Sequence, residues 1–229
     1  MRGLGTLINT ATVIAGGGVG LLVGSRIPER LRTTIVQVIG IATLVMGIDS
    51  VLDTGNLVFP LVGTAIGAII GELIGVEERL EGVGERLRRR FAGDDDGSFV
   101  RGFVTATLLF CIGPLTILGA IEDASGVTPQ LYIVKGTLDG FMAVIFTATY
   151  GIGAAFSALS VFVVQGLLTL GGTGLDAILD DRMRTEMFAS GGFMVLAIGL
   201  NLLGIAKVRL GSLLPGLVVT PLLVVWFAV

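Results

Sequence analysis

The sequence contains no histidine, a single cysteine at Cys111, and charged residues at only 14% of its 229 positions. Without histidine or a second thiol it lacks the residues for imidazole or paired-thiolate zinc sites, a histidine-based catalytic triad or an internal disulfide. Fifteen basic against eighteen acidic residues give a net charge of −3 at pH 7, which excludes the basic footprint that nucleic acid needs. We therefore expect no enzyme, no cofactor and no nucleic-acid partner.

Long apolar runs dominate the sequence, with 53% hydrophobic residues and 36 glycines. A hydrocarbon core about 30 Å thick requires roughly 20 apolar residues per crossing helix, so we predict an all-α integral membrane protein. The first run ends before Arg26 and lacks a small-residue cleavage site, which favours a retained helix over a signal peptide. Seven further runs bring the predicted spans to eight, at 34–53, 56–75, 102–121, 135–153, 155–173, 187–206 and 210–228.

The lysines and arginines fall mainly on alternate loops, and cytoplasmic loops are the ones enriched in them. If the N-terminus lies outside, eleven basic residues lie in inner loops and only Arg2, Arg182 and Arg184 lie in outer segments. We therefore predict a multi-pass protein of the plasma or inner membrane with both termini extracytoplasmic. This orientation requires a tight turn around Gly151 and Gly153 to separate the fifth span from the sixth. The inner set is Arg26, Arg30, Arg32, Arg79, Arg86, Arg88, Arg89, Arg90, Arg101, Lys207 and Arg209.

Residues 76–98 form a polar segment between the third and fourth spans. Its first part carries apolar residues at helical spacing, which predicts an amphipathic helix in the membrane interface. The arginines near its end could hold anionic lipid headgroups at about 1 kcal/mol each, or could only set the topology. An acidic linker, Asp94–Asp96, follows. The four arginines are Arg86, Arg88, Arg89 and Arg90.

An internal repeat is predicted by the similarity between the segments that begin at Leu31 and at Met183. The two copies begin in loops on opposite sides of the membrane. Inverted repeats of this kind are a recurring construction of secondary transporters. We therefore predict a first repeat at 1–75, a central helix pair at 99–153 and an inverted repeat at 154–229, so that spans one to three mirror spans six to eight. The aligned pairs are Arg32 with Arg184, Gly40 with Gly192, Gly47 with Gly199, Asp49 with Asn201 and Pro60 with Pro215.

Glycines recur every four residues in the first and third spans. Small residues at this spacing share one helix face and let two backbones approach closely, which favours tight helix packing in lipid. They indicate packing seams, although a channel lined by such a seam is also compatible with them. The residues are Gly16, Gly20 and Gly24 in one span, and Gly63, Gly67, Gly71 and Gly75 in the other.

The fourth span contains Cys111, Gly113 and Pro114 near its middle. Proline removes a backbone donor and clashes with the preceding turn, so the helix should kink or break there. Backbone groups freed in hydrocarbon must be satisfied by protein or water. The break indicates either a buried ligand-binding region or a packing kink.

Lys135 and Asp139 lie four residues apart in the fifth span and share one helix face. An unpaired charge at the bilayer centre costs at least about 2.5 to 3.5 kcal/mol, so the two side chains should pair or face water. Asp139 is predicted to be a functional group, with a structural ion pair as the alternative. Softer candidates for polar contacts are Asn9, Thr12, Ser157, Gln165, Thr169, Asp49 and Asn201, while Glu122 and Asp123 are expected to flank an outer mouth.

Three segments resemble the domain-of-unknown-function 554 family of prokaryotic membrane proteins, and the likeness covers nearly the whole chain. The resemblance implies a polytopic inner-membrane protein, at most a transporter, and no particular substrate. The segments are Gly5-Thr6-Leu7-Ile8-Asn9 with Gly16-Gly17-Gly18, Cys111-Ile112-Gly113-Pro114 with Gly119, and Lys135-Gly136-Thr137-Leu138-Asp139-Gly140.

Together these observations favour a small secondary transporter or exporter of an ion or small polar solute, working by alternating access around Asp139 and Lys135. An oligomeric channel and a non-transporting scaffold that binds lipid remain alternatives. Membrane lipids and an unidentified solute or ion are the expected partners, with a homo-oligomer left open.

Overall fold

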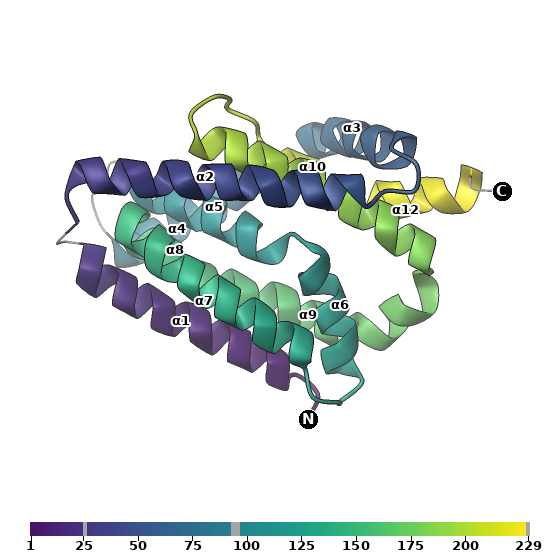
Figure 1. The fold of residues 1–229 in the computed structure, drawn as a ribbon, viewed down its shortest axis with the longest axis horizontal. Helices are drawn as coiled ribbons and strands as arrows, with labels where there is room; N and C mark the ends of the chain where they lie inside the picture. Colours follow the sequence, from purple (N-terminus) through teal and green to yellow (C-terminus); the bar gives the residue numbers. More distant parts are fainter. Residues whose placement is uncertain (25–26, 93–96, 228–229) are drawn as a thin grey trace. The chain divides into compact units, whose positions relative to one another are not determined.

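The computed structural model describes residues 1–24, 27–92 and 97–227. Every regular element within them is a helix, which confirms the all-α prediction, whereas Arg26 and the acidic linker Asp94–Asp96 lie outside the described residues. Figure 1 shows the helices along the chain. In order they are α1 (Leu4–Gly24), α2 (Glu29–Leu52), α3 (Val58–Ile74), α4 (Val76–Phe91), α5 (Ser98–Cys111), α6 (Pro114–Ala124), α7 (Gln130–Tyr150), α8 (Ile152–Ala155), α9 (Ser157–Ile178), α10 (Asp181–Leu202), α11 (Leu210–Leu213) and α12 (Gly216–Phe227).

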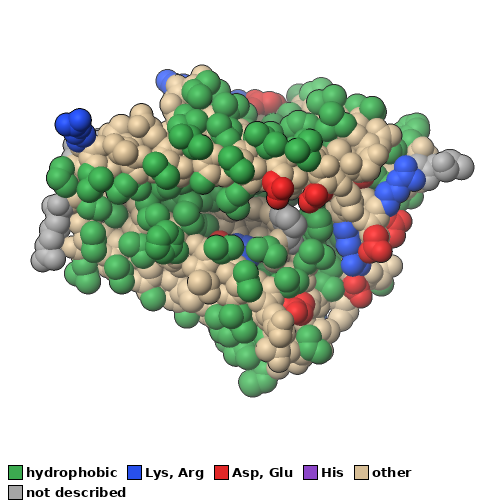
Figure 2. Space-filling model, viewed as in Figure 1, with side chains coloured by type: hydrophobic (Ala, Val, Ile, Leu, Met, Phe, Trp, Pro, Cys, Tyr) green, Lys and Arg blue, Asp and Glu red, His purple; other side chains and the backbone are tan. Residues whose placement is uncertain are grey.

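Among the described residues, six helical segments are long and apolar enough to cross a membrane. Two bent helix pairs, α3 with α4 and α5 with α6, raise the number of candidate spans to as many as eight, at bends of 56° and 61°. These candidate spans fall at the eight predicted runs, although the bent α3–α4 pair also includes 76–91, which the sequence predicts to lie in the membrane interface. Hydrophobic side chains cover much of the surface seen in Figure 2, as expected of helices that face lipid.

The predicted turn between the fifth and sixth spans is present. α7 ends at Tyr150, and Gly151 then adopts a φ of 76°, in the left-handed region that favours glycine. α8 begins at Ile152 and leads into α9, so 130–150 and 152–178 are separate candidate spans.

The described helices form two compact units. The first comprises residues 1–35 and 81–176, and the second comprises residues 36–80 and 177–229. α2 begins in the first unit and continues into the second. The core of the first unit is rich in aromatic side chains that are almost completely buried, namely Phe99, Phe103, Phe110, Tyr132 and Phe146.

In the first unit, the glycine face of α1 packs directly against the backbone of α7. A Cβ atom placed on Gly16 would lie 2.1 Å from the carbonyl oxygen of Gly140. One placed on Gly20 would lie 2.5 Å from the carbonyl oxygen of Val144. No side chain fits between the two backbones at these positions, so glycine is required by the close approach rather than by helix propensity.

In the second unit, α3 packs in the same manner on α11 and α12. A Cβ atom on Gly67 would lie 2.2 Å from the backbone nitrogen of Gly216, and one on Gly71 would lie 2.0 Å from the carbonyl oxygen of Ser212. The predicted glycine seams are therefore contacts between helices within each unit, except at Gly75, which ends α3 with a φ of 65° and lies near Glu78 only.

α2 and α10 meet through two reciprocal glycine contacts in the second unit. A Cβ atom on Gly47 would lie 3.0 Å from the carbonyl oxygen of Gly192, and one on Gly192 would lie 3.0 Å from that of Gly47. Gly40 and Gly199 approach each other in the same reciprocal way, at 3.4 and 3.0 Å.

The α1–α7 contact predicts opposite effects for two alanine substitutions on one helix. Gly16→Ala should destabilise the protein by about 1–3 kcal/mol or more, because the methyl group meets backbone that cannot move aside. Gly18→Ala should be neutral or slightly stabilising, because nothing lies within 4 Å of its Cβ position and alanine favours the helix. Thermal unfolding in lipid nanodiscs measures both. Equal stability of the two variants would contradict the contact.

Candidate functional site

The fourth span breaks where the sequence predicts, because two residues without helical geometry separate α5 from α6. α5 ends at Cys111, Ile112 is extended, and Gly113 has a φ of 144° that favours glycine. Pro114 is the first residue of α6, where its missing donor costs nothing. The last carbonyl groups of α5 therefore have no intrahelical partner.

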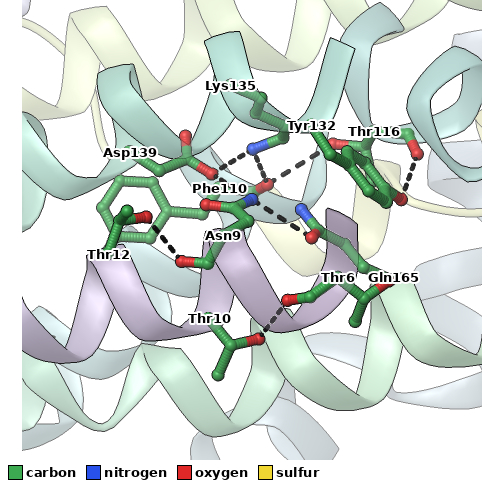
Figure 3. A network of polar contacts seen from close by, with 10 residues as sticks. All are labelled: Thr6, Asn9, Thr10, Thr12, Phe110, Thr116, Tyr132, Lys135, Asp139 and Gln165. Carbon is green, nitrogen blue, oxygen red and sulfur yellow. Dashed lines mark hydrogen bonds and ion pairs between the residues drawn. The ribbon is translucent and has the colours of Figure 1, made fainter. Parts of the chain in front are cut away.

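Lys135 of α7 reaches one of these carbonyl groups. Its Nζ atom donates to the carbonyl oxygen of Phe110 at 2.7 Å and forms an ion pair with Asp139 Oδ2 one turn further along α7 (Figure 3). A helix C-terminus carries partial negative charge and stabilises a nearby cation. The broken helix and the carboxylate thus hold one buried ammonium group between them.

Two amide side chains complete the cluster around this ion pair. Asn9 Nδ2 of α1 donates to Asp139 Oδ2 at 2.9 Å and to Gln165 Oε1 of α9 at 3.1 Å. Asn9 and Gln165 are fully buried. The structure therefore brings together four candidates that lie far apart in the sequence. We call Asn9, Lys135, Asp139 and Gln165 the polar cluster.

The polar cluster leaves two polar atoms unsatisfied within the part of the chain that the structure describes. Asn9 Oδ1 and Gln165 Nε2 are buried without a hydrogen-bond partner. Each such atom costs about 1–3 kcal/mol of desolvation. One acceptor and one donor thus remain beside the ion pair, a feature that a purely structural cluster would be expected to avoid.

The other predicted site residues at the break are Cys111, Gly113 and Pro114. Cys111 ends α5 close enough for Lys135 and Asp139 to act on it electrostatically, and its thiol is free. Gly113 forms the break itself. The side chain of Pro114 lies outside the described part of the structure.

Glu122 and Asp123 lie near the end of α6, where Glu122 is half-buried and Asp123 is buried. Asp123 is fully buried and accepts hydrogen bonds from the backbone nitrogens of Gly5 and Thr6, at 2.9 and 3.1 Å, and from the Thr6 and Thr169 hydroxyl groups. It therefore caps the positive N-terminus of α1. Glu122 accepts from the backbone nitrogen of Leu131 at 2.8 Å. Asp123 thus forms a buried contact between α6 and α1.

Tyr132 was not identified from the sequence. Its ring is completely buried beside Gly5 and Gly119, and its hydroxyl group donates to the carbonyl oxygen of Thr116 at 2.8 Å. It fixes α6 against α7 immediately beyond the break. Its position three residues before Lys135, on the same helix face, is the signal that could have identified it.

Glu186 in the second unit was also missed. Only 1% of its surface is exposed, and its carboxylate accepts from the backbone nitrogens of Gly55 and Asn56, at 3.0 and 3.1 Å, and from the Thr54 hydroxyl group. It thereby ties the α2–α3 loop to α10. A cavity of about 420 Å³ adjoins it, lined by Gly55, Asp181, Arg182, Thr185 and Glu186.

Asn201 and Asp49, the aligned polar residues of the predicted repeat, have different surroundings. The Asn201 side chain both donates to and accepts from the Val208 backbone, each at 2.8 Å, and so closes the α10–α11 loop. The side chain of Asp49 is exposed on α2. Asn201 therefore stabilises the α10–α11 loop.

The predicted amphipathic helix is α4. Glu85 lies 2.7 Å from Arg88 and 3.0 Å from Arg89, and these guanidinium groups lower the pKa of the Glu85 carboxyl to about 2. Arg86 is exposed, and Arg90 lies 5.7 Å from the centre of the Phe91 ring. Glu85 thus neutralises part of the positive charge that the sequence alone suggests for lipid binding.

These features define a multi-pass helical membrane protein with a buried lysine–aspartate pair at a broken helix. Among the described residues, no group of three or more cysteine, aspartate and glutamate side chains could hold a metal ion. The chain belongs to the family described as "Protein of unknown function (DUF554)", whose profile matches residues 4–225.

Two relatives resemble the chain over almost their whole length. It is 31% identical to "Uncharacterized membrane protein YdfK" of Bacillus subtilis (strain 168), over 96% of this chain and 95% of the relative. It is 30% identical to "Uncharacterized protein YqgA" of Escherichia coli (strain K12), over 98% of each. No solved structure matches it. Neither the description of the family nor the names of these two relatives state an activity.

The ion pair predicts a non-additive effect on stability. Lys135→Met should destabilise the protein by about 3–5 kcal/mol, because it leaves the buried Asp139 carboxylate without its cation. The double variant Lys135→Met with Asp139→Leu should recover most of this loss, because no charge then remains unpaired. Denaturant titration in mixed micelles measures the free energies of unfolding.

Lys207→Met is the matched control, since Lys207 is the other lysine and is exposed in a loop. It should change the stability by less than about 0.5 kcal/mol. If the double variant is at least as unstable as Lys135→Met, the loss of stability does not come from the unpaired charge of Asp139.

Proposed function

We propose that the protein is a small secondary transporter of an ion or small polar solute, with Lys135 and Asp139 as its charged element. The observation that carries the proposal is the burial of this pair at a break in a membrane-spanning helix. Charged residues inside a membrane are costly and mark ion or substrate pathways more often than packing contacts. Irregular backbone at membrane depth occurs where it is buried in protein or lines a cavity.

The reciprocal glycine contacts of the second unit support an inverted repeat. The sequence alignment matches Gly40 with Gly192 and Gly47 with Gly199. A two-fold relation that exchanges the aligned residues converts the Gly40–Gly199 contact into the Gly192–Gly47 contact, and both contacts are present. Repeats related in this way let one part of a transporter rock against the other.

Asp139 is the member of the pair that suits a transport cycle. Its side chain keeps 11% of its surface accessible, and the two unsatisfied amide atoms lie beside it. A bound cation or proton would change the charge of the cluster by one unit. Moving one such charge across the membrane is worth about 2.3 kcal/mol per 100 mV, enough to couple the cycle to the membrane potential.

The function is tested by Asp139→Asn in proteoliposomes. We expect this substitution to abolish charge movement after concentration jumps of sodium, potassium, chloride or protons on a solid-supported membrane, while the protein stays folded. Asp49→Asn, on the exposed face of α2, should behave as wild type.

Three results would contradict the proposal. Wild-type flux in the Asp139→Asn variant would remove Asp139 from the mechanism. Discrete single-channel currents in a planar bilayer would indicate a channel. Loss of anionic-vesicle binding on neutralising Arg86, Arg88, Arg89 and Arg90, with no flux in any variant, would indicate a lipid-binding scaffold.

The inverted repeat predicts that two loops face opposite compartments. In a Cys111→Ser background, Arg30→Cys and Arg182→Cys place one thiol before each repeat copy. A membrane-impermeant maleimide added to intact cells should label Arg182→Cys and spare Arg30→Cys, because both termini are proposed to be extracytoplasmic. Labelling of both positions from the same side would exclude the inverted relation.

A further inference from the structure

The amide groups of Asn9 and Gln165 form a short hydrogen-bonded chain that ends on the Asp139 carboxylate. Asn9 donates both of its Nδ2 hydrogens, one to Asp139 and one to Gln165 (Figure 3). An ionised carboxylate only accepts hydrogen bonds, so this direction fits Asp139 without a proton. The hydrogen bonds from Asn9 to Gln165 and to Asp139 therefore have a defined direction, which depends on the charge of Asp139.

Rotating both amide groups by half a turn exchanges oxygen and nitrogen and leaves the other heavy atoms in place. Asn9 Oδ1 would then face Asp139 Oδ2 and the Gln165 nitrogen, and would accept from both if Asp139 carried a proton. The two unsatisfied atoms would change from Asn9 Oδ1 and Gln165 Nε2 to Asn9 Nδ2 and Gln165 Oε1. The two arrangements thus have the same number of hydrogen bonds and differ by one proton.

We propose that Asp139 binds the coupling proton, and that Asn9 and Gln165 reverse their hydrogen bonds when it does. A proton from water forms an O–H bond at Asp139 Oδ2, and the charge of the polar cluster rises by one. Asn9 Oδ1 then accepts this hydrogen, and Gln165 Nε2 donates to the same oxygen. The role in transport depends on the proposed function, whereas proton binding itself does not.

Lys135 has a hydrogen-bond partner in both states, because its ammonium group contacts two acceptors. When Asp139 is ionised, the ammonium group pairs with it. When Asp139 is neutral, the ammonium group keeps the Phe110 carbonyl oxygen at the negative end of α5, at 2.7 Å. The proton can therefore arrive and leave without release of the lysine.

Few other titratable groups act on Asp139 within the described part of its unit. The Cys111 thiol of α5 and the Tyr132 hydroxyl group of α7 lie close enough to interact with Asp139 electrostatically. Lys135 is the nearby cation. Asp123, at the end of α6, is separated from the polar cluster by one helical turn of α1 and of α9, marked by Thr6 and Thr169.

Infrared difference spectroscopy of the full chain in lipid bilayers tests the proposal directly, with protons as the ligand. A downward pH jump should produce a protonated carboxyl band. A change in the side-chain amide carbonyl bands should appear with the same midpoint. Isotope-labelled glutamine and asparagine assign the amide bands in the wild-type protein, which has three residues of each type.

Variants identify the residues that produce the bands. Asp139→Asn should lose the carboxyl band and the amide change together. Asn9→Leu should lose the amide change but keep the carboxyl band, whereas Gln165→Leu should lose only the glutamine part of the amide change and keep the carboxyl band. Thr10→Val is the control on α1 and should keep both signals, because the Thr10 hydroxyl group donates to the Thr6 carbonyl oxygen of its own helix and not to the polar cluster.

The midpoint of the carboxyl band separates a reversible donor from a fixed one. A fixed Asn9 donor would favour the ionised carboxylate alone, so Asn9→Leu would raise the midpoint by about 1–2 pH units. A reversible Asn9 stabilises both states, so the midpoint should move by less than about one unit.

Two outcomes would overturn the inference. One is a carboxyl band without any amide change in the wild-type protein. The other is the absence of a carboxyl band that depends on Asp139. If the infrared signals are present but no ion flux is measured, the proposed transport function is wrong and proton binding at Asp139 stands. If flux is measured without these signals, proton binding at Asp139 is wrong and the transport function stands.

Discussion

The ammonium group of Lys135 connects the broken helix to the buried carboxylate, and the arrangement of the first unit depends on this contact. Without the break at Ile112 and Gly113, the Phe110 carbonyl would be less available to a side chain, because its helix would continue. Without Lys135, the partial negative charge of the helix end and the charge of Asp139 would lose their shared cation and keep only neutral donors, the Thr116 hydroxyl group and the Asn9 amide group. The break before Pro114 therefore exposes a carbonyl group, and Lys135 supplies the donor that this carbonyl group needs.

The glycine seam of α1 and α7 determines where Asn9 lies. A Cβ atom on Gly136 would come within 3.1 Å of the Asn9 Cα atom and of the Thr12 hydroxyl oxygen. The absence of a side chain there allows α1 to approach α7 closely enough for Asn9 to reach Asp139. Packing residues and polar residues thus have one joint effect: small side chains bring a short amide within hydrogen-bond distance of a carboxylate.

Several features could be predicted from the sequence because their causes are local. The spans follow from length and hydropathy, the break from Pro114, and the pairing of Lys135 with Asp139 from their helical spacing. The burial of Asp123 and Glu186 could not be predicted. Each carboxylate binds the backbone of a segment more than a hundred residues away, and only the folded chain brings such donors to it.

Two buried aspartates in the described part of the first unit, Asp123 and Asp139, differ in a way that bears on function. Asp123 accepts from four neutral donors at the positive end of α1, and these donors satisfy its carboxylate. Asp139 instead depends on one ammonium group, which has a second partner, and on one amide group, which can turn. Loss of charge at Asp123 would weaken the contact that holds the N-terminus of α1. Loss of charge at Asp139 leaves each of its neighbours with an alternative hydrogen bond. An exchangeable group needs this second kind of environment, so of the two aspartates only Asp139 suits a working site.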